Sequence, residues 1–574
     1  MKLNKHLLVL AASLLLASCG SITSSNTNGG SASQDYDVVT SVSVDSSQWG
    51  NADSKDVTDE DADATITLNG TSASTDDTTR VSIDSSTITI TSKGIYRVSG
   101  SSSNLTIVVN DTTKSGNIYL VFDNVAMTHS SFATLYAKSA DKVIVQLVGE
   151  NSFKNTGSYV QIDSDKTVDG AVFSSDDITF NGEGSLEVAS TDHGIVAKDD
   201  FKMTGGTIEI TATNKGVDAS DSARFGGGSL TINSGTDGIH VENDELDGYI
   251  YVEDGDINIT STGGDGIYSC GKISLIGGDI EVISGGGSSK SKNSSLSTKG
   301  VKSDGAIEIG STSVEVSSND DAIHAAGSIS ITNGDVEVSS SDDGIHSDAT
   351  LAISGGEVSV TKSYEGLEAE TVNISGGTVS VVASDDGINA AGGSDSQSSE
   401  THDWRQGSSA TGTLKISGGN IYINASGDGL DTNGSMYISG GYTIVEGPTN
   451  GGNGALDKGD GSNCVASITG GTVLAIGTTD MAINFDSGSQ CSGLVSLSGS
   501  SGTTISVNDG SGFSFTASKS FACAVYSSSY MSKGNSYTIT AGSSTATMNF
   551  SSSLYYSNIS GGMGGGGMTP GGRR

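Results

Sequence analysis

The chain has few of the residues on which most globular folds depend. Of 574 residues, 34% are hydrophobic and 5% aromatic, and there are only 2 prolines and 5 cysteines. Basic residues are scarce as well, because 28 lysines and arginines face 67 aspartates and glutamates, giving a formal net charge of -39. This imbalance disfavours binding to nucleic acid or to anionic lipid head groups, since both are negatively charged. Calcium, or a polymer bridged by calcium, stays open as a partner.

Low hydrophobic content combined with high charge would indicate disorder if the apolar residues were scattered. They are ordered instead, because Val and Ile alternate with Ser, Thr, Asn and Asp over most of the length, as in short strands with one buried face. The general hydrolase signatures GxSxG and HExxH are absent, and so is a phosphate-binding loop. The sequence therefore predicts a strand-rich protein without a common hydrolytic motif.

The N-terminus has the pattern of an export signal. Lys2 and Lys5 precede the apolar stretch 7–16, which is too short to span a bilayer, and Leu16-Ala17-Ser18-Cys19 resembles a bacterial lipobox. The resemblance implies cleavage before Cys19, lipidation of its sulfur, and a location in the cell envelope, at the outer membrane or cell surface. The pairing of the other four cysteines stays open between disulfides and buried thiols: Cys270, Cys464, Cys491 and Cys523.

An internal repeat runs through the middle of the chain. A glycine, replaced once by Ala322, recurs most often every 22 residues, and larger steps coincide with Gly/Ser-rich insertions at 285–298 and 392–412. Each repeat contains three short strands and three corners, which is typical of one coil of a parallel β-helix. A propeller blade would need about 40 residues, a sandwich would show no fixed period, and a calcium β-roll would repeat every nine residues.

We therefore predict an all-β fold, a right-handed parallel β-helix solenoid with about 22 residues per coil. Both ends of such a stack need a cap. The predicted segments are a signal peptide (1–18), a flexible tether (19–55), an N-terminal cap with the first coils (56–175), the regular β-helix (176–495), a small C-terminal β-subdomain (496–556) and a Gly-rich tail (557–574).

Stacking places equivalent residues of successive coils about 4.8 Å apart, in columns. One outward column, in the second strand of each repeat, holds Glu187, Glu209, Thr231, Asn258, Glu281, Glu315, Glu337, Ser359, Ser380 and Tyr422. The corner before the repeated glycine carries acids, and stacked carboxylates at this spacing repel one another unless a calcium ion lies between them. Turn preference for Asp before Gly is the competing explanation. The corner predicts calcium ligands at Asp192, Asp237, Asp265, Asp320, Asp321, Asp342, Asp343, Asp385 and Asp386.

Just past this corner, a third column holds Asp218, His240, His324, His346, Glu368, Asn389, Asp431 and Asp457. His324 and His346 fall on adjacent coils. Zinc needs three or four converging ligands, and the neighbours in this column are Lys302 and Glu368. The sequence therefore favours a solvated histidine stack over a metal site.

Several motifs in this order resemble a bacterial carbohydrate-binding β-helix domain that binds calcium and polygalacturonate and is akin to family 9 pectate lyases. They are Val168-Asp169-Gly170 through Ile178, Asp192-His193-Gly194 through Asp200, and Asp237-Gly238-Ile239. The similarity extends to Ala140–Val143 upstream and Asn453–Asp457 downstream. The resemblance implies calcium on Asp176, Asp177, Asp192, Asp199, Asp200, Asp237 and Asp265. Lys215 and Lys299 stand where the pattern prefers an acid, so those coils are expected to differ.

The leading hypothesis is a monomeric, lipid-anchored protein that binds an acidic plant polysaccharide such as pectate through calcium. Few aromatic side chains are available to stack on sugars, the candidates being Trp404, Tyr251, Tyr422 and Tyr437. One alternative is a calcium-dependent pectate lyase with a lysine base, for which the candidates are Lys198, Lys215, Lys299 and Lys302. Another is a structural adhesin or extracellular spacer in which calcium serves only stability.

Overall fold

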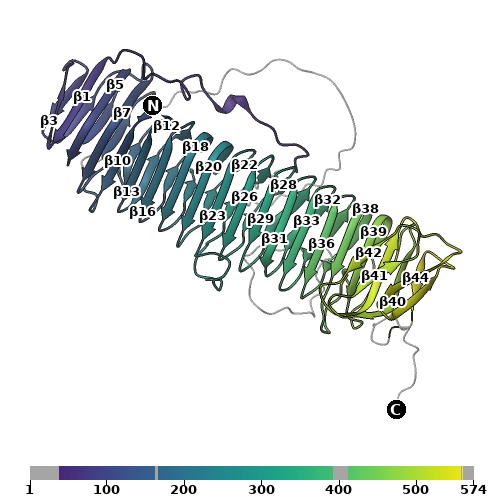
Figure 1. Cartoon of the computed structure of the whole chain (residues 1–574). Helices are drawn as coiled ribbons and strands as arrows, with labels where there is room; N and C mark the ends of the chain where they lie inside the picture. Colours follow the sequence, from purple (N-terminus) through teal and green to yellow (C-terminus); the bar gives the residue numbers. More distant parts are fainter. Residues whose placement is uncertain (1–37, 162–165, 392–411, 558, 560–574) are drawn as a thin grey trace, which may run out of the picture. The chain divides into compact units, whose positions relative to one another are not determined.

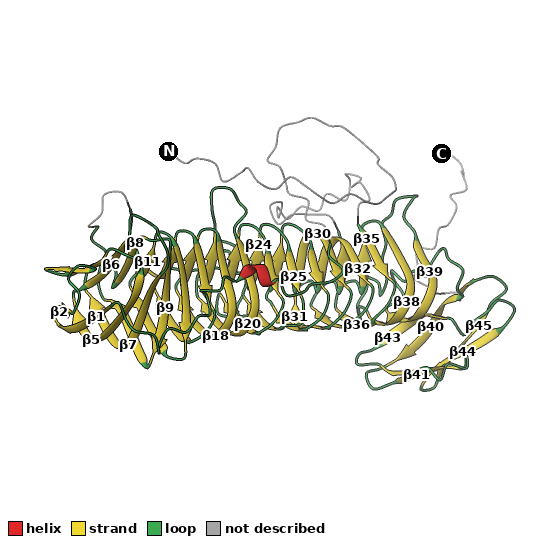
Figure 2. Cartoon of the chain, turned by 90° about the horizontal axis from the view of Figure 1, so that it is seen from above, coloured by secondary structure: helices red, strands yellow, loops and turns green. Residues whose placement is uncertain are grey.

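The computed structural model describes residues 38–161, 166–391, 412–557 and 559. The prediction of an all-β protein is confirmed, because these residues form one long sheet system and a small separate sheet (Figure 1). The one helix of the described residues is the short 3-10 helix η1 (Ser46–Gln48), drawn red in Figure 2. No helix in the described ranges is long and apolar enough to cross a membrane.

Most strands belong to three ladders in which each strand pairs in parallel with its equivalent in the next repeat. In the first ladder Ile323 pairs with Ile345, and Ile345 with Leu367. Its strands are β4 (Thr87–Ile90), β6 (Thr106–Asn110), β8 (Leu135–Ser139), β11 (Gly170–Ser174), β14 (His193–Ala197), β17 (Val217–Ala219), β19 (Ile239–Val241), β21 (Ile267–Ser269), β24 (Val301–Ser303), β27 (Ile323–Ala325), β30 (Ile345–Ile353), β32 (Leu367–Ile374), β34 (Ile388–Ala390) and β37 (Leu430–Thr432).

The second ladder follows the first along each repeat and also includes the later parts of β30 and β32. Its other strands are β1 (Ala64–Gly70), β5 (Gly94–Ser103), β7 (Ile118–His129), β9 (Lys142–Val148), β12 (Asp177–Gly182), β15 (Asp200–Met203), β18 (Ser222–Ser234), β20 (Tyr249–Ser261), β22 (Ile273–Leu275), β25 (Ile307–Ile309), β28 (Ile329–Ile331), β35 (Thr413–Ile416), β38 (Ser435–Glu446) and β39 (Ala466–Gly477).

The third ladder includes the later parts of β7, β18, β20, β38 and β39. Its other strands are β10 (Glu150–Asn155), β13 (Ser185–Ser190), β16 (Thr207–Ala212), β23 (Asp279–Ser284), β26 (Ser313–Ser318), β29 (Asp335–Ser339), β31 (Glu357–Ser363), β33 (Thr378–Ala383) and β36 (Asn420–Ala425). The register places Glu187 beside Glu209, and Ser380 beside Tyr422, as the outward column predicted.

The core is an apolar interior between the three ladders. Ile323, Ile345 and Leu367 are fully buried neighbours in the first ladder, and Val338 and Val360 are their counterparts in the third. The alternation of apolar and polar residues produces this arrangement, because successive side chains of a strand point to opposite faces. The four cysteines of the described residues are buried and free of disulfides.

Antiparallel pairing is confined to the two ends of the described chain. Near the N-terminal end, β2 (Ser72–Thr75) pairs with β1, and β3 (Val81–Asp84) with β4. Near the C-terminal end, β43 (Phe521–Ser528) pairs with both β39 and β40 (Ser492–Gly499), which also pairs with β46 (Leu554–Tyr556). The separate antiparallel sheet contains β41 (Thr504–Val507), β42 (Ser514–Thr516), β44 (Ser536–Ala541) and β45 (Ser544–Asn549).

Residues 38–56, which we call the N-terminal strap, pack against second-ladder strands. The Val39 backbone N–H donates to Ser330 Oγ (3.1 Å), and Trp49 Nε1 donates to Glu253 Oε2 (2.7 Å). Asp53 is fully buried against β9 and β12. The predicted flexible tether is therefore wrong for residues 38–55, where specific polar contacts hold a segment that has no apolar period; residues 19–37 lie outside the described ranges.

Candidate cation-binding site

The aspartates that precede the repeated glycine, or Ala322, form an inter-repeat clamp. We call them the aspartate column: Asp237, Asp265, Asp321, Asp343, Asp386 and Asp428. Asp321 Oδ1 accepts the Asp343 backbone N–H (3.1 Å), and Asp343 Oδ1 accepts the Glu365 N–H (3.2 Å). Asp386 Oδ1 accepts the Asp428 N–H in the same way (2.6 Å). One carboxylate oxygen of these residues thus supports the fold, while the other can meet a side chain or a cation.

Three residues after each position of the aspartate column lies a residue of a second column, on the first ladder. We call this the flanking column; it includes Asp218, His240, Lys302, His324, His346, Glu368, Asn389 and Asp431. The register confirms its order, because Lys302 pairs with His324, His346 with Glu368, and Asn389 with Asp431. In the earlier repeats, side chains at the two positions contact each other. Lys215 Nζ lies 2.8 Å from Asp218 Oδ1, and His240 Nδ1 lies 2.7 Å from Asp237 Oδ2.

Two lysines neutralise the middle of the aspartate column. Lys299 Nζ contacts Asp321 Oδ2 and lies 3.3 Å from Asp320 Oδ1. Lys292, in the insertion 285–298, contacts both Asp320 and Asp342. Burial opposes ionisation of Asp321, yet Lys299 and the hydrogen bonds from His324 and His346 hold its pKa well below the ordinary value. The predicted calcium ligands Asp320, Asp321 and Asp342 therefore already have internal counter-cations.

In the later repeats the acids have fewer basic partners among the described residues, although Lys458 lies near Asp457. We call this group the C-terminal acidic run: Glu365, Asp386, Asp428, Asp431 and Asp457. Burial and neighbouring carboxylates raise the pKa of Glu365 to about 8 and that of Asp386 to about 6. The same causes raise the pKa of Asp428 and of Asp431 to about 7. Among the described residues, no lysine or arginine ion-pairs with Asp386, Asp428 or Asp431.

A second concentration of acid lies at the turn that leads from the first ladder to the second. We call Asp177, Asp199 and Asp221 the N-terminal corner. Burial and the carboxylates of its neighbours raise the pKa of Asp199 to about 7, and burial and Asp200 raise that of Asp177. Positive charge reaches Asp177, because Lys142 Nζ lies 3.7 Å from its Oδ2 and Lys202 also acts on it. A cation could bridge the carboxylates of Asp199 and Asp221.

Other predicted calcium ligands have protein partners. Asp176 ion-pairs with Lys114 and accepts the Ala140 N–H (3.0 Å). Asp200 lies 2.6 Å from an Arg224 guanidinium nitrogen, and Asp192 accepts a bond from Asn214 (3.2 Å). Asp265 accepts bonds from Ser297 (2.7 Å) and the Lys299 N–H (2.8 Å), and Asp385 is hydrogen-bonded to Tyr364. Contacts within the protein therefore account for each of these aspartates, and no bound cation is needed to explain them.

The four lysines predicted as possible lyase bases all sit beside carboxylates. Lys198 Nζ lies 3.2 Å from Asp218 Oδ2, the carboxylate that also holds Lys215. Lys299 contacts Asp321, and Lys302 Nζ lies 3.7 Å from Asp265 Oδ2 and over the Tyr268 ring. An ion pair stabilises the protonated amine, whereas a base must release its proton. Charge neutralisation accounts for these positions.

The structure separates the aromatic candidates for glycan contact. Tyr437 is 42% exposed and lines a cavity of about 440 Å³ together with Lys415. Tyr422 is covered, because its ring lies 6.4 Å from that of Phe515 and its hydroxyl donates to Glu446. Tyr251 is buried beneath Trp49 of the strap. The prediction of exposed platforms is therefore wrong for Tyr422 and Tyr251, and Trp404 lies outside the described residues.

Five acids of these groups were not among the predicted calcium ligands: Asp221, Glu365, Asp428, Asp431 and Asp457. Asp221 lies one 22-residue repeat after Asp199, and Glu365 directly precedes the repeated Gly366. Asp428 likewise precedes the repeated Gly429, and Asp431 and Asp457 belong to the column just past that corner. Spacing along the repeat was therefore the signal that could have identified all five. The histidine pair also differs from its prediction, because His324 and His346 are only 7% and 2% exposed.

Comparison with known proteins gives a consistent result. A family described as carbohydrate-binding domain-containing protein matches residues 84–344 and 342–511. A carbohydrate-binding domain-containing protein of Acetivibrio thermocellus is 31% identical over 150 residues, which cover 25% of this chain and 52% of the relative. The matched region thus spans about half the length of that curated relative. A gadolinium derivative of a polysaccharide lyase-like protein from C. thermocellum is 30% identical, covering 44% of this chain and 96% of the other at a TM-score of 0.38.

Proposed function

Because the chain belongs to the family of carbohydrate-binding domain-containing proteins, we propose that it binds an acidic plant polysaccharide of the polygalacturonate type through calcium. We propose further that its parallel ladders are those of a right-handed β-helix. The observation that carries the calcium part is the C-terminal acidic run, where carboxylates with raised pKa values succeed one another without a lysine or arginine ion-paired to Asp386, Asp428 or Asp431 among the described residues.

Calcium suits this arrangement for two reasons. It takes six to eight oxygen ligands at about 2.3–2.6 Å, so carboxylates on adjacent repeats can share one ion. A flexible shell also leaves positions for an outside carboxylate, such as that of a uronate. At a net charge of -39, the protein would otherwise repel an acidic polymer. The N-terminal corner offers the same chemistry at a second place, within the first family-matched segment.

The lipobox-like Leu16-Ala17-Ser18-Cys19 supports anchoring of this binding region to the cell envelope. These residues lie outside the described ranges, so anchoring rests on the sequence. A lipid on Cys19 would hold the binding surface outside the cell, and plant polymers are found there.

Retention on insoluble polygalacturonate tests the function. We expect the purified protein to be retained in calcium and released in EDTA, with an unchanged circular dichroism spectrum. The double variant Asp428→Asn/Asp431→Asn should bind about 10-fold or more weakly, because it removes two charged ligands. The matched control is Asp256→Asn/Asp335→Asn, two exposed acids on the third ladder.

Three outcomes would contradict the proposal or redirect it. Equal retention in calcium and EDTA would exclude calcium bridging. No retention in either buffer would exclude polygalacturonate binding. It would favour the alternative of a structural adhesin or extracellular spacer, in which calcium serves only stability. Ultraviolet absorbance from an unsaturated uronate would indicate a lyase, despite the ion-paired state of the four candidate lysines.

Tyr437 provides a separate test of where the sugar lies. Replacing it with alanine should weaken polygalacturonate binding about 2–10-fold without affecting stability, since an exposed aromatic contact contributes about 0.5–1.5 kcal/mol. Tyr530, which is 60% exposed in the C-terminal part, is the matched control for alanine replacement. Equal affinities of the two variants would place the glycan away from the cavity beside Lys415.

A further inference from the structure

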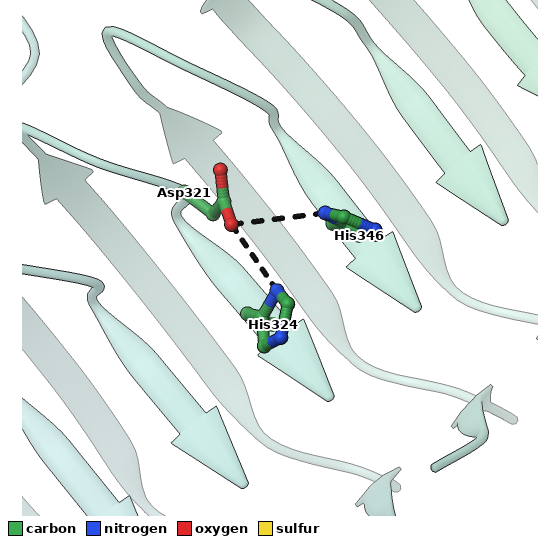
Figure 3. Close-up of side chains that lie close together, drawn as sticks. All are labelled: Asp321, His324 and His346. Atoms are coloured by element: carbon green, nitrogen blue, oxygen red, sulfur yellow. Dashed lines mark hydrogen bonds and ion pairs between the residues drawn. The ribbon is translucent and has the colours of Figure 1, made fainter. Parts of the chain in front are cut away.

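A buried histidine, His346, lies among four carboxylates from three successive repeats. One of them, Asp348 Oδ1, is 3.4 Å from Nε2, and the other three face Nδ1. His346 Nδ1 is 3.6 Å from Asp343 Oδ2, 3.6 Å from Glu368 Oε2 and 3.8 Å from Asp321 Oδ2. Figure 3 shows Asp321 between the two histidine rings, with His324 Nδ1 3.1 Å from Asp321 Oδ2. One imidazole nitrogen and several carboxylate oxygens thus converge on a small volume.

The surrounding fold fixes these groups in place. His346 is in β30 and Glu368 in β32, which are directly paired. Asp343 belongs to the turn before β30, and its Oδ1 is held by the Glu365 N–H (3.2 Å). His346 is 2% exposed and Asp343 6%. Because ladder register and a backbone hydrogen bond set the positions, little rearrangement is needed for the side chains to act together.

We propose that Asp343, His346 and Glu368 form a site for a divalent transition-metal ion of the zinc class. Ligand atoms about 2.1 Å from a tetrahedral ion lie about 3.4 Å from one another, close to the two observed separations of 3.6 Å. All three ligand atoms lie within 4.8 Å of one another. A water molecule or a sugar oxygen would supply the fourth position.

Charge distinguishes this centre from the neighbouring group Asp321, His324 and His346. The Lys299 ammonium contacts Asp321 Oδ2, so an ion bound to that oxygen would lie beside a fixed positive charge. Asp343 instead lies near the carboxylates of Glu365 and Glu368, in addition to those of Asp321 and Asp342, which are paired with Lys299 and Lys292. This local concentration of carboxylates favours a dication. Asp321 then forms one wall of the site and His324 packs on His346, with ring centroids 4.8 Å apart.

The imidazole separates this site from the calcium positions proposed above. Calcium prefers oxygen ligands, whereas imidazole nitrogen suits zinc and related ions. A cavity of about 520 Å³ reaches one of the three proposed ligands, Asp343, and is also lined by Glu365 and Lys299. The inference goes beyond the proposed function, because it concerns a different ion at different residues. Its rival is a protonated His346 that serves as the counter-cation of the same carboxylates.

Cobalt and zinc titrations of the metal-free protein in excess calcium test the site. We expect one equivalent of Co²⁺ to give the visible d–d bands of a four- or five-coordinate ion, and Zn²⁺ to displace it. His346→Gln and Glu368→Gln should each weaken binding about 100-fold or more, at or beyond the loss seen when an outer partner of a metal site is removed. The control Asp335→Asn should bind normally.

His324→Gln decides between the two overlapping centres. It should keep cobalt binding within a few fold, because His324 is a neighbour and not a ligand of the proposed ion. Loss as large as that of His346→Gln would overturn the assignment, and so would absence of cobalt bands in the folded wild-type protein. Calcium-dependent polygalacturonate retention should be unchanged in His346→Gln, so failure of the zinc site and failure of the proposed function are separable.

Discussion

Replacing Asp53 with alanine is expected to destabilise the protein by about 3–5 kcal/mol, the loss typical of breaking a buried ion pair from one side. Asp53 is fully buried, and its carboxylate lies 2.8 Å from Lys142 Nζ and 3.7 Å from Lys202 Nζ. Burial opposes its ionisation, but the hydrogen bonds from Lys142 and the Gly50 N–H hold its pKa below the ordinary value. Without Asp53, two nearly buried ammonium groups would lose this shared partner.

Urea denaturation measures the loss, followed by circular dichroism and by tryptophan emission. Trp49 is in the same strap and contacts Tyr251 and Glu253, so its emission reports detachment of the strap. In Asp53→Ala we expect this emission to shift at lower urea than the loss of β-structure. Asp59→Ala, an exposed acid nearby, should leave both transitions in place. An equal, small effect of the two variants would mean that the strap does not stabilise the fold.

In EDTA, the stability of the protein is expected to fall as pH rises from about 5 to about 8. Asp386, Asp428, Asp431 and Glu365 have folded-state pKa values of about 6, 7, 7 and 8, all above their ordinary values. Between the ordinary and the raised pKa the folded protein binds more protons than the unfolded chain, so unfolding becomes more favourable as pH rises. Partial exposure and mutual coupling reduce the sum, which we place on the order of 2–4 kcal/mol.

Thermal unfolding at several pH values in EDTA and in calcium checks this expectation. Calcium binds the ionised carboxylates, so it should remove most of the decline and stabilise the protein most at pH 8. Asp428→Asn/Asp431→Asn should flatten the profile in EDTA, whereas Asp256→Asn/Asp335→Asn should not. The acids with lowered pKa, including Asp53 and Asp321, act in the opposite direction and lose their contribution only at more acidic pH. A midpoint that rises from pH 5 to 8 in EDTA would contradict the assignment.

The columns could be read from the sequence because they follow from local periodicity. Glu187, Glu209 and Thr231 were predicted to stack, and the ladder register pairs them in that order. Asp321 and Asp343 could likewise be assigned to one corner, since a period of two residues along a strand and 22 along the chain fixes face and neighbour. What the sequence could not supply was the ionic state of each acid.

Long-range contacts from segments outside the repeat decided that state. Lys292 reaches Asp342, 50 residues away, from an insertion, and Asp53 reaches Lys142, 89 residues away, from the strap. Tyr422 was placed outward correctly, yet the added sheet covers it with Phe515. The sequence by itself therefore determined the all-β repeat, the buried face and the order of the acidic columns, because these depend on spacing along the chain. Only the tertiary structure decided which acids are neutralised and which aromatic rings are exposed, because those depend on where the non-repeating segments pack.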